Sequence, residues 1–177
     1  MLIVPALFIP QDFVVPKTFD CQYFHFRVLE DTISELDYEA VMSSHLRLQG
    51  MFGSQYMWPK SDMTLDENTE SLRLHKQEFE SHVAFAYSVF NSAKNRCLGS
   101  IYIDPSQLPQ YDCVVYFWIR DDSLELESAL HQAVLNWLQE QWPFSKIVFP
   151  GRSLSLASWE KELISANNLN RKVSYGS

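Results

Sequence analysis

Two groups of polar side chains in the middle of the chain are of the types that move protons. His75 and Glu78 lie three residues apart in a segment of helical periodicity, so they form either a solvated pair or an acid/base pair. Tyr102 and Asp104 close a strand-like segment and point to the same face of it. A carboxylate at a strand end beside tyrosines can act as a general base, and it can equally cap the turn that begins at Pro105. The sequence leaves both interpretations open.

A loop rich in aromatic residues could contribute a binding surface. Residues 50–62 contain two glycines, Tyr56 and the dipeptide Trp58-Pro59. Aromatic rings in such a loop form either a wall for a substrate or a cover packed onto the core. No GxSxG, phosphate-loop, HExxH or Cys–His signature accompanies these residues, so hydrolase, NTPase and metalloprotease functions have no support, and no metal site is expected.

The segment 120–127 lies where a strand runs into a helix, which is the usual position of a phosphate site. It begins with Arg120 and contains no glycine. Its acidic residues are Asp121, Asp122, Glu125 and Glu127. Acids in a first helical turn interact favourably with the helix dipole, which explains them without a ligand. A pyrophosphate bound at the same place would face several negative charges.

The elements around this segment form a βαβ unit. The runs 113–120 and 146–150 are apolar and β-branched or aromatic, as in buried strands, and 97–104 is a strand that stops at Pro105. Residues 126–142 have apolar positions at helical spacing and end before Pro143. A strand, a helix and a second strand in this order require the two strands to run parallel, with a right-handed crossover.

The remaining elements follow from hydrophobic patterns and helix caps. Further strands are expected at 23–30, 82–90 and 171–175. Further helices are expected at 31–49, from Thr64 to about Ser81, and at 153–168. Thr64 and Glu67 have the spacing of a capping box. Residues 1–20 hold three prolines between apolar residues and are expected to form an extended arm, followed by a single domain over 21–177.

Composition narrows the class of protein. The 177 residues have 46% apolar content and a net charge of −8, which fits a globular domain and disfavours a nucleic-acid backbone binder. Three cysteines without a CxxC pair indicate reduced thiols, and hence a cytoplasmic protein. The apolar N-terminus is interrupted by Pro5 and Pro10 and has no basic flank, so neither a signal peptide nor a membrane span is expected.

Several short strings and the order of the elements resemble one superfamily. The strings are 26–29, 37–42, Trp58-Pro59, Thr64-Leu65 with Asn68, 98–103, 115–120 and Trp142-Pro143-Phe144. From about Gln22 onward the chain resembles the GNAT acetyltransferase superfamily, in a small, divergent, bacterial-type branch. The resemblance implies an α/β (α+β) fold: a mixed, mostly antiparallel sheet with one parallel, splayed strand pair around the βαβ unit, and helices on both faces.

The resemblance also implies a cofactor, acetyl-CoA, bound in the splay between 113–120 and 146–150. The residues implied in binding it are Phe117, Trp118, Ile119, Arg120 and Ser123. The backbone of the first three would hold the acetyl carbonyl, and Arg120 would contribute positive charge for the pyrophosphate. The glycine positions of the superfamily's phosphate loop fall on Ser123 and two glutamates here, so the carboxylates would have to turn outward.

The activity that the resemblance implies is direct acetyl transfer to an amine of a small molecule or peptide, in a monomer or homodimer. Glu78 and Asp104 are the candidate bases, and Tyr116 is the candidate acid. Trp58 and Tyr102 are the candidate acceptor-binding residues. The alternative is a degenerate GNAT domain that has lost the cofactor and serves as a ligand sensor or interaction module, which the acidic loop favours.

Overall fold

The protein folds around one six-stranded sheet. The computed structural model describes the backbone of residues 7–174 and the side chains of residues 7–168. The strands are β1 (Thr18–Asp20), β2 (Phe24–Val28), β3 (Phe85–Asn91), β4 (Cys97–Pro105), β5 (Cys113–Ile119) and β6 (Ile147–Val148). They lie in sequence order across the sheet, and every neighbouring pair is antiparallel except β5 and β6, which are parallel. The first strand belongs to the segment expected to be an extended arm.

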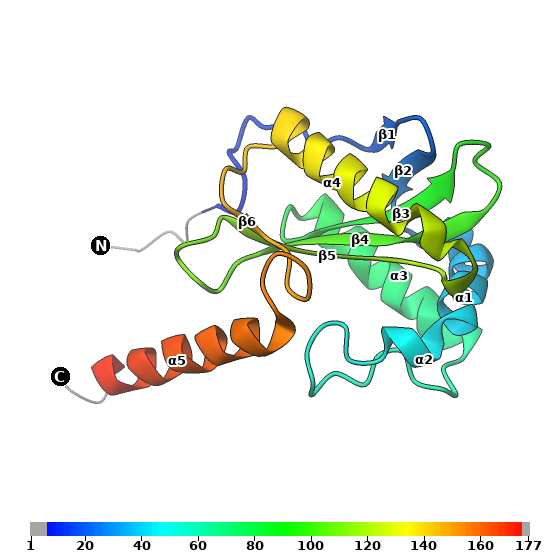
Figure 1. Ribbon diagram of the computed structural model, residues 1–177. Helices are drawn as coiled ribbons and strands as arrows, with labels where there is room; N and C mark the ends of the chain where they lie inside the picture. Colours follow the sequence, from blue (N-terminus) through cyan, green and yellow to red (C-terminus); the bar gives the residue numbers. More distant parts are fainter. Residues whose placement is uncertain (1–6, 175–177) are drawn as a thin grey trace.

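Helices cover both faces of this sheet. They are α1 (Ser34–Ser43), α2 (His45–Leu48), α3 (Leu65–Glu80), α4 (Glu127–Gln141) and α5 (Leu156–Ser174), with 3-10 helices η1 (Asp31–Ile33) and η2 (Asp121–Leu126). Figure 1 shows α4 on one face and α1, α2 and α3 on the other. The predicted architecture, a mostly antiparallel mixed sheet with helices on both faces, is therefore confirmed.

The predicted βαβ unit is present. An unbroken α4 connects β5 to β6, and the two strands pair only at their beginnings, Cys113 with Ile147 and Val114 with Val148. Beyond these pairs β6 ends while β5 continues to Ile119. Among residues 7–174, one edge of β5 therefore has no neighbouring strand over its second half.

Successive side chains of a strand point to opposite faces of the sheet, so the hydrophobic core is divided into two clusters, one on each face. Phe117 and Ile101 belong to the cluster that packs under α4, whereas Trp118 and Tyr102 belong to the cluster under α1 and α3. Gly99 lets β4 and β5 approach, because a Cβ at this position would lie 1.9 Å from the carbonyl oxygen of Trp118. The two strands that bear most of the candidate site residues are thus held tightly together.

The ends of several elements test the sequence predictions. The capping box is confirmed, since the Glu67 amide donates to Thr64 Oγ1 at 3.2 Å and the Thr64 amide donates to Glu67 Oε2 at 2.8 Å. The helix predicted over 31–49 is divided into three pieces and interrupted at Ser44. The strand predicted at 171–175 is wrong as far as Ser174, because α5 continues through a stretch without glycine or proline. Tyr175 lies outside the described residues.

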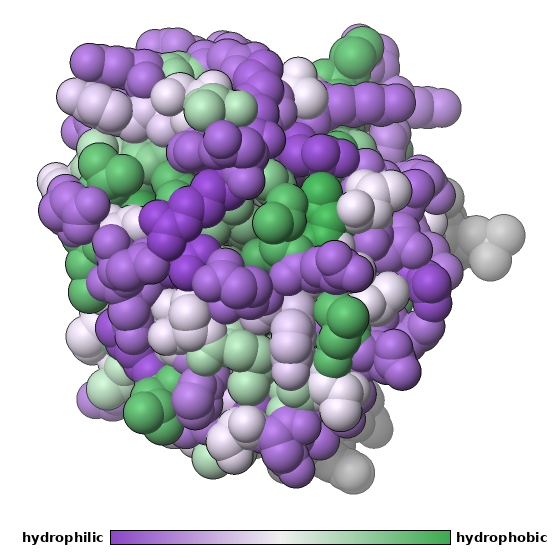
Figure 2. Space-filling view, turned by 90° about the vertical axis from the view of Figure 1, so that its right-hand side faces the viewer, coloured by the Kyte–Doolittle hydropathy of each residue, from purple (hydrophilic) through white to green (hydrophobic). Residues whose placement is uncertain are grey.

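The face of the protein in Figure 2 is mostly hydrophilic. On the face in Figure 2, apolar side chains gather in small groups between polar ones. None of the helices within residues 7–174 has the length and apolar character needed to cross a membrane.

Candidate active site

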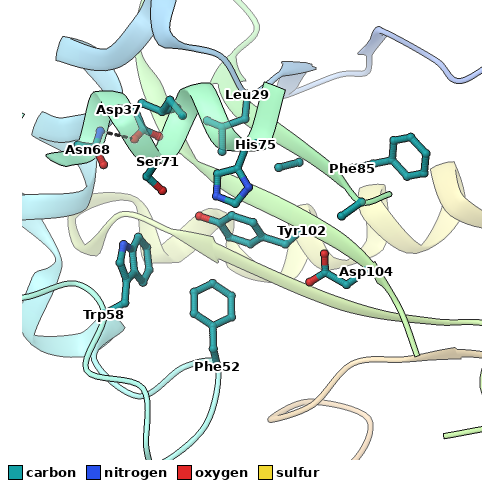
Figure 3. A pocket seen from close by; sticks show the side chains of 13 residues that line it. Leu29, Asp37, Phe52, Trp58, Asn68, Ser71, His75, Phe85, Tyr102 and Asp104 are labelled. Atoms are coloured by element: carbon teal, nitrogen blue, oxygen red, sulfur yellow. Dashed lines mark hydrogen bonds between the residues drawn. The ribbon is translucent and has the colours of Figure 1, made fainter. Parts of the chain in front are cut away.

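A cavity of about 170 Å³ lies under α3, between the sheet and the aromatic loop. Figure 3 shows Asn68, Ser71 and His75 of α3 on one side, Tyr102 and Asp104 of β4 beside them, and Trp58 and Phe52 opposite. We call this the inner cavity. Its lining residues are Leu29, Asp37, Phe52, Trp58, Asn68, Ser71, Leu72, His75, Ala84, Phe85, Ala86, Tyr102 and Asp104.

A larger hollow of about 700 Å³ adjoins it, since Asp104 and Phe52 line both. We call this the outer groove. It runs between the aromatic loop, the ends of β4 and β5, and the first half of α5, with Tyr56, Tyr116, Trp159 and Glu160 among its lining residues. The two hollows therefore lie side by side, with Phe52 and Asp104 at their boundary.

Asp37 is the most deeply buried carboxylate of the site. It is 4% exposed and accepts a hydrogen bond from Asn68 Nδ2 at 2.8 Å. Burial raises its pKa from 3.8 to about 6, an effect that the Asn68 hydrogen bond only partly offsets. At neutral pH the group is therefore mostly ionised, at a cost in stability.

Asp104 lies where the inner cavity and the outer groove meet. Burial, and secondarily the charge of Glu78, raises its pKa to about 6. Glu78 itself does not line either hollow; its Oε2 lies 3.3 Å from Nδ1 of His75, which does. Burial lowers the pKa of His75 despite this neighbour. The predicted His75–Glu78 pair thus exists as a contact behind the cavity wall.

The tyrosines stand on neighbouring strands. Tyr102 of β4 faces the inner cavity, and its hydroxyl accepts from Trp118 Nε1 at 3.3 Å. Tyr116, its partner in the β4–β5 register, faces the outer groove. Burial raises the pKa of Tyr116 to about 12, so its phenol stays protonated and can donate.

The unpaired part of β5 presents backbone groups on the side away from β4. The Arg120 amide donates to the Leu98 carbonyl of β4 at 2.7 Å, and successive residues of a strand alternate in hydrogen-bonding direction. Trp118 therefore bonds toward β4, whereas Phe117 and Ile119 bond outward. We call the outward groups of Phe117 and Ile119 the open edge of β5.

Two arginines bind the open edge. Arg152, in the turn after β6, donates from Nη2 to the Phe117 carbonyl at 3.2 Å, and its guanidinium carbon lies 3.7 Å from the centre of the Phe117 ring. Arg47 of α2 donates from Nη2 to the Ile119 carbonyl. Each arginine is also paired with an acid of the segment 121–127, Arg152 with Glu127 and Arg47 with Asp121.

Arg120 is held within the fold. It is 3% exposed, and its guanidinium donates to both carboxylate oxygens of Glu39 at 2.7 and 2.6 Å and to Asp122 at 2.8 Å. These bonds raise the pKa of Arg120 and lower that of Glu39. Ser123 is also buried, and its hydroxyl donates to Asp122 at 3.1 Å. The side chains of both residues are thus engaged in fixing the 121–127 segment.

The comparison with known proteins rests on structure. No family model and no curated protein sequence matches the chain. Ribosomal-protein-S5-alanine acetyltransferase from Vibrio fischeri is similar with a TM-score of 0.55 and 10% identity, over 68% of this chain and 66% of that one. RimL, a ribosomal L7/L12 α-N-protein acetyltransferase in complex with coenzyme A, gives 0.54 and 11%, over 69% and 68%. This chain has the GNAT fold.

A third similar structure widens the range of acceptors among proteins with this fold. It is a spermidine N-acetyltransferase chimera from Vibrio cholerae and hSSAT, with a TM-score of 0.51 and 14% identity, over 72% of this chain and 70% of that one. The similar structures thus include enzymes for protein amines and an enzyme for a small amine. At these identities the likeness describes the fold, and the chemistry must be argued from the residues.

The GNAT-fold site contains residues that the sequence patterns did not single out. Asp37 lies three and four positions before the buried Ala40 and Val41, so helical spacing alone would have placed this acid on the buried face. Arg47 and Arg152 carried no such signal, because they are 105 positions apart and meet β5 only through the fold. Across residues 7–168, no three His, Cys, Asp or Glu side chains gather as a metal site requires.

Proposed function

We propose that this protein is an N-acetyltransferase that moves the acetyl group of acetyl-CoA to an amine bound in the outer groove. The observation that carries the proposal is the adjacency of two features on β5. Phe117 belongs to the open edge, and the residue before it, Tyr116, lines the outer groove together with Asp104. A strand edge can pair with an extended, amide-bearing ligand, while the groove receives the acceptor.

The open edge fits the extended part of the cofactor, whereas the 121–127 segment alone does not fit its phosphates. This segment is acidic, and its amides at Asp121 and Ser123 already donate to Ser44 Oγ and to the Arg120 carbonyl. We assign the phosphates to Arg47 and Arg152, which lie at the open edge and provide the missing positive charge. In this assignment the backbone of Phe117 and Ile119 holds the cofactor, while Trp118, Arg120 and Ser123 position that backbone.

The chemistry divides between two side chains of the outer groove. Acetyl-CoA, when bound, supplies an acetyl group activated as a thioester. Asp104 accepts a proton from the ammonium group of the acceptor, a role that suits a carboxylate with a pKa of about 6 better than an ordinary one. The free amine then attacks the thioester carbon and the C–S bond breaks. Tyr116 donates the proton of its phenol to the leaving sulfur, and the second proton of the attacking nitrogen returns to the phenolate as the amide forms. Trp58 and Tyr102 line the acceptor side, and Glu78 raises the proton affinity of Asp104.

The proposal is tested first by binding and then by turnover. Isothermal calorimetry with acetyl-CoA should give saturable binding, and an amine panel with colorimetric detection of the free thiol should identify an acceptor. Tyr116→Phe should slow thiol release while leaving the calorimetric dissociation constant unchanged. Absence of heat at millimolar acetyl-CoA, where binding of only about −4 kcal/mol is detected, would overturn the proposal.

The second candidate function is a GNAT-fold module without acetyl transfer. It is favoured by the contacts of Arg47 and Arg152, which already occupy both carbonyls of the open edge. In such a module the arginines would serve as permanent caps of an unpaired strand edge. Calorimetry separates the two functions, because a module of this kind gives no heat with acetyl-CoA and still binds a ligand in the hollows.

A further inference from the structure

The inner cavity extends past the groups that acetyl transfer requires. Asp104 and Tyr116 both line the outer groove, so the proposed base and acid belong to the same hollow. Asp37, Asn68 and Trp58 line only the inner cavity. Asp37 is the ionisable group among these three residues, so its burial there requires an explanation of its own.

Asp37 has no cationic partner in the described part of the chain. Its polar neighbours are neutral, since Asn68 donates to it from Nδ2 at 2.8 Å and Ser100 lies beside it, and none of the ion pairs among residues 7–168 includes it. A buried carboxylate that is neither paired nor bound to a cation destabilises a fold. Because Asp37 also lines the inner cavity, a cation bound there would have this carboxylate as its counter-ion.

The walls of the cavity suit the same kind of ligand. Trp58 and Phe52 face the cavity from the aromatic loop, and Tyr102 faces it from β4. Aromatic faces attract ammonium groups, while Asn68 and Ser71 add polar atoms that can accept hydrogen bonds from one. The space of about 170 Å³ corresponds to roughly five water molecules, enough for an ammonium group and a few methylenes.

The separation of the two carboxylates sets the length of the ligand. Asp37 lies next to Ser100 of β4, and Asp104 stands four residues further along the same strand. At the rise of a β-strand, four residues span about 13 Å, so the carboxylates are separated by a distance on the order of 10 Å. A chain of several methylenes is needed to bring one amine to each.

We propose that the inner cavity binds a second ammonium group of the acceptor, with Asp37 as its counter-ion, so that the acceptor is an elongated aliphatic diamine or polyamine. This assignment rests on the proposed function for the reacting amine, but the binding site itself does not depend on acetyl transfer. The reacting amine lies at Asp104, the distal ammonium lies at Asp37, and the aromatic loop closes over the methylenes.

A matched pair of probes tests the site without the cofactor. Calorimetry with diaminooctane and with n-octylamine compares ligands of equal chain length that differ only in the second ammonium. Wild type should bind the diamine at least about tenfold more tightly, the scale of one buried charge interaction. Asp37→Asn, which keeps the shape and the acceptor for Asn68, should reduce this preference to about twofold. Asp62→Asn, at an exposed position of the same loop region, should keep it.

Two results would overturn the inference: equal affinity of wild type for the two probes, or an undiminished preference in Asp37→Asn. Trp58→Leu is a second variant. It should weaken binding of the diamine more than binding of the monoamine, because it removes one aromatic face. Failure of acetyl transfer with the diamine preference intact would refute the acetyltransferase assignment and leave the ammonium site standing. Conversely, acetyl transfer to monoamines and diamines at equal kcat/KM, together with equal binding of the two, would support the acetyltransferase assignment and refute the ammonium site.

Discussion

The open edge of β5 and the inner cavity treat charge in opposite ways. At the open edge, Arg47 and Arg152 each pair with a carboxylate of the segment 121–127, as does the neighbouring Arg120. In the inner cavity, Asp37 and Asp104 lie within the described chain without a cationic partner, and burial raises the pKa of both. One region is neutralised by the protein itself, and the other keeps uncompensated negative charge.

This difference assigns the two regions different relations to their ligands. A ligand at the open edge must replace existing contacts, so its affinity is a difference between old and new ion pairs. A cation in the inner cavity instead relieves a charge that the fold tolerates at a cost. The charges at the open edge are balanced by the protein alone, whereas a bound cation in the inner cavity should stabilise the folded protein.

The largest effect should come from removing the proposed base at the junction of the hollows. Asp104→Asn should lower kcat by about 10²–10⁴-fold, the usual contribution of general-base catalysis, and leave the acetyl-CoA dissociation constant unchanged. In wild type, kcat/KM should rise with pH through about 6, because the raised pKa keeps Asp104 protonated below that value. An equal loss in Asp62→Asn, or a pH profile flat between 5 and about 7, would contradict this assignment.

The next effect concerns the uncompensated charge of Asp37 in the unliganded protein. Folding raises the pKa of this carboxyl group, so the free energy of unfolding of the protein falls as pH rises through the interval from 3.8 to about 6. Asp37→Asn should therefore stabilise the protein by about 3 kcal/mol above pH ~7, and by almost nothing below pH ~4. Urea unfolding at the two pH values measures it. A variant less stable than wild type at high pH would show that the charge is compensated.

The neutralised region is tested by Arg152→Ala. Loss of a charge-assisted bond to phosphate should weaken acetyl-CoA by about 1.5–3 kcal/mol in calorimetry. The same variant should not weaken the binding of acetylated pantetheine, because this ligand has no diphosphate for Arg152 to contact and the substitution frees the Phe117 carbonyl. Arg73→Ala, which removes the two ion pairs that Arg73 of α3 makes with Asp31 and Glu70, is the control and should change neither affinity. Equal weakening of both ligands would assign Arg152 a structural role.

The smallest effect is expected from a change at the start of α3, which tests whether ligand binding in the inner cavity depends on the position of this helix. Thr64→Ala removes the capping box and should cost about 1 kcal/mol of stability, measured by thermal unfolding. Because α3 carries Asn68 and His75 but no residue of the open edge, the affinity for the amine should fall slightly while that for acetyl-CoA stays constant. A change in acetyl-CoA affinity alone would contradict the separation of the two regions.

Local patterns in the sequence determined the framework of this protein. Hydrophobic periodicity and Pro105 and Pro143 marked β4, β5 and α4, and the order of strand, helix and strand required the parallel pair β5–β6. The Thr64–Glu67 box fixed the start of α3. Tyr102 and Asp104 were predicted to share a face, and both line the inner cavity, because alternation along a strand is a local property.

Only the tertiary structure decided how charges are distributed around the site. The resemblance implies Arg120 as a source of positive charge for the phosphates, yet Glu39, 81 positions earlier, binds its guanidinium. Arg47 and Arg152 reach the open edge from segments far apart in the chain. Asp37 is buried because α1 packs against β4. Ion pairing and desolvation depend on which segments meet in space, and the pattern of neighbouring residues along the chain does not contain that information.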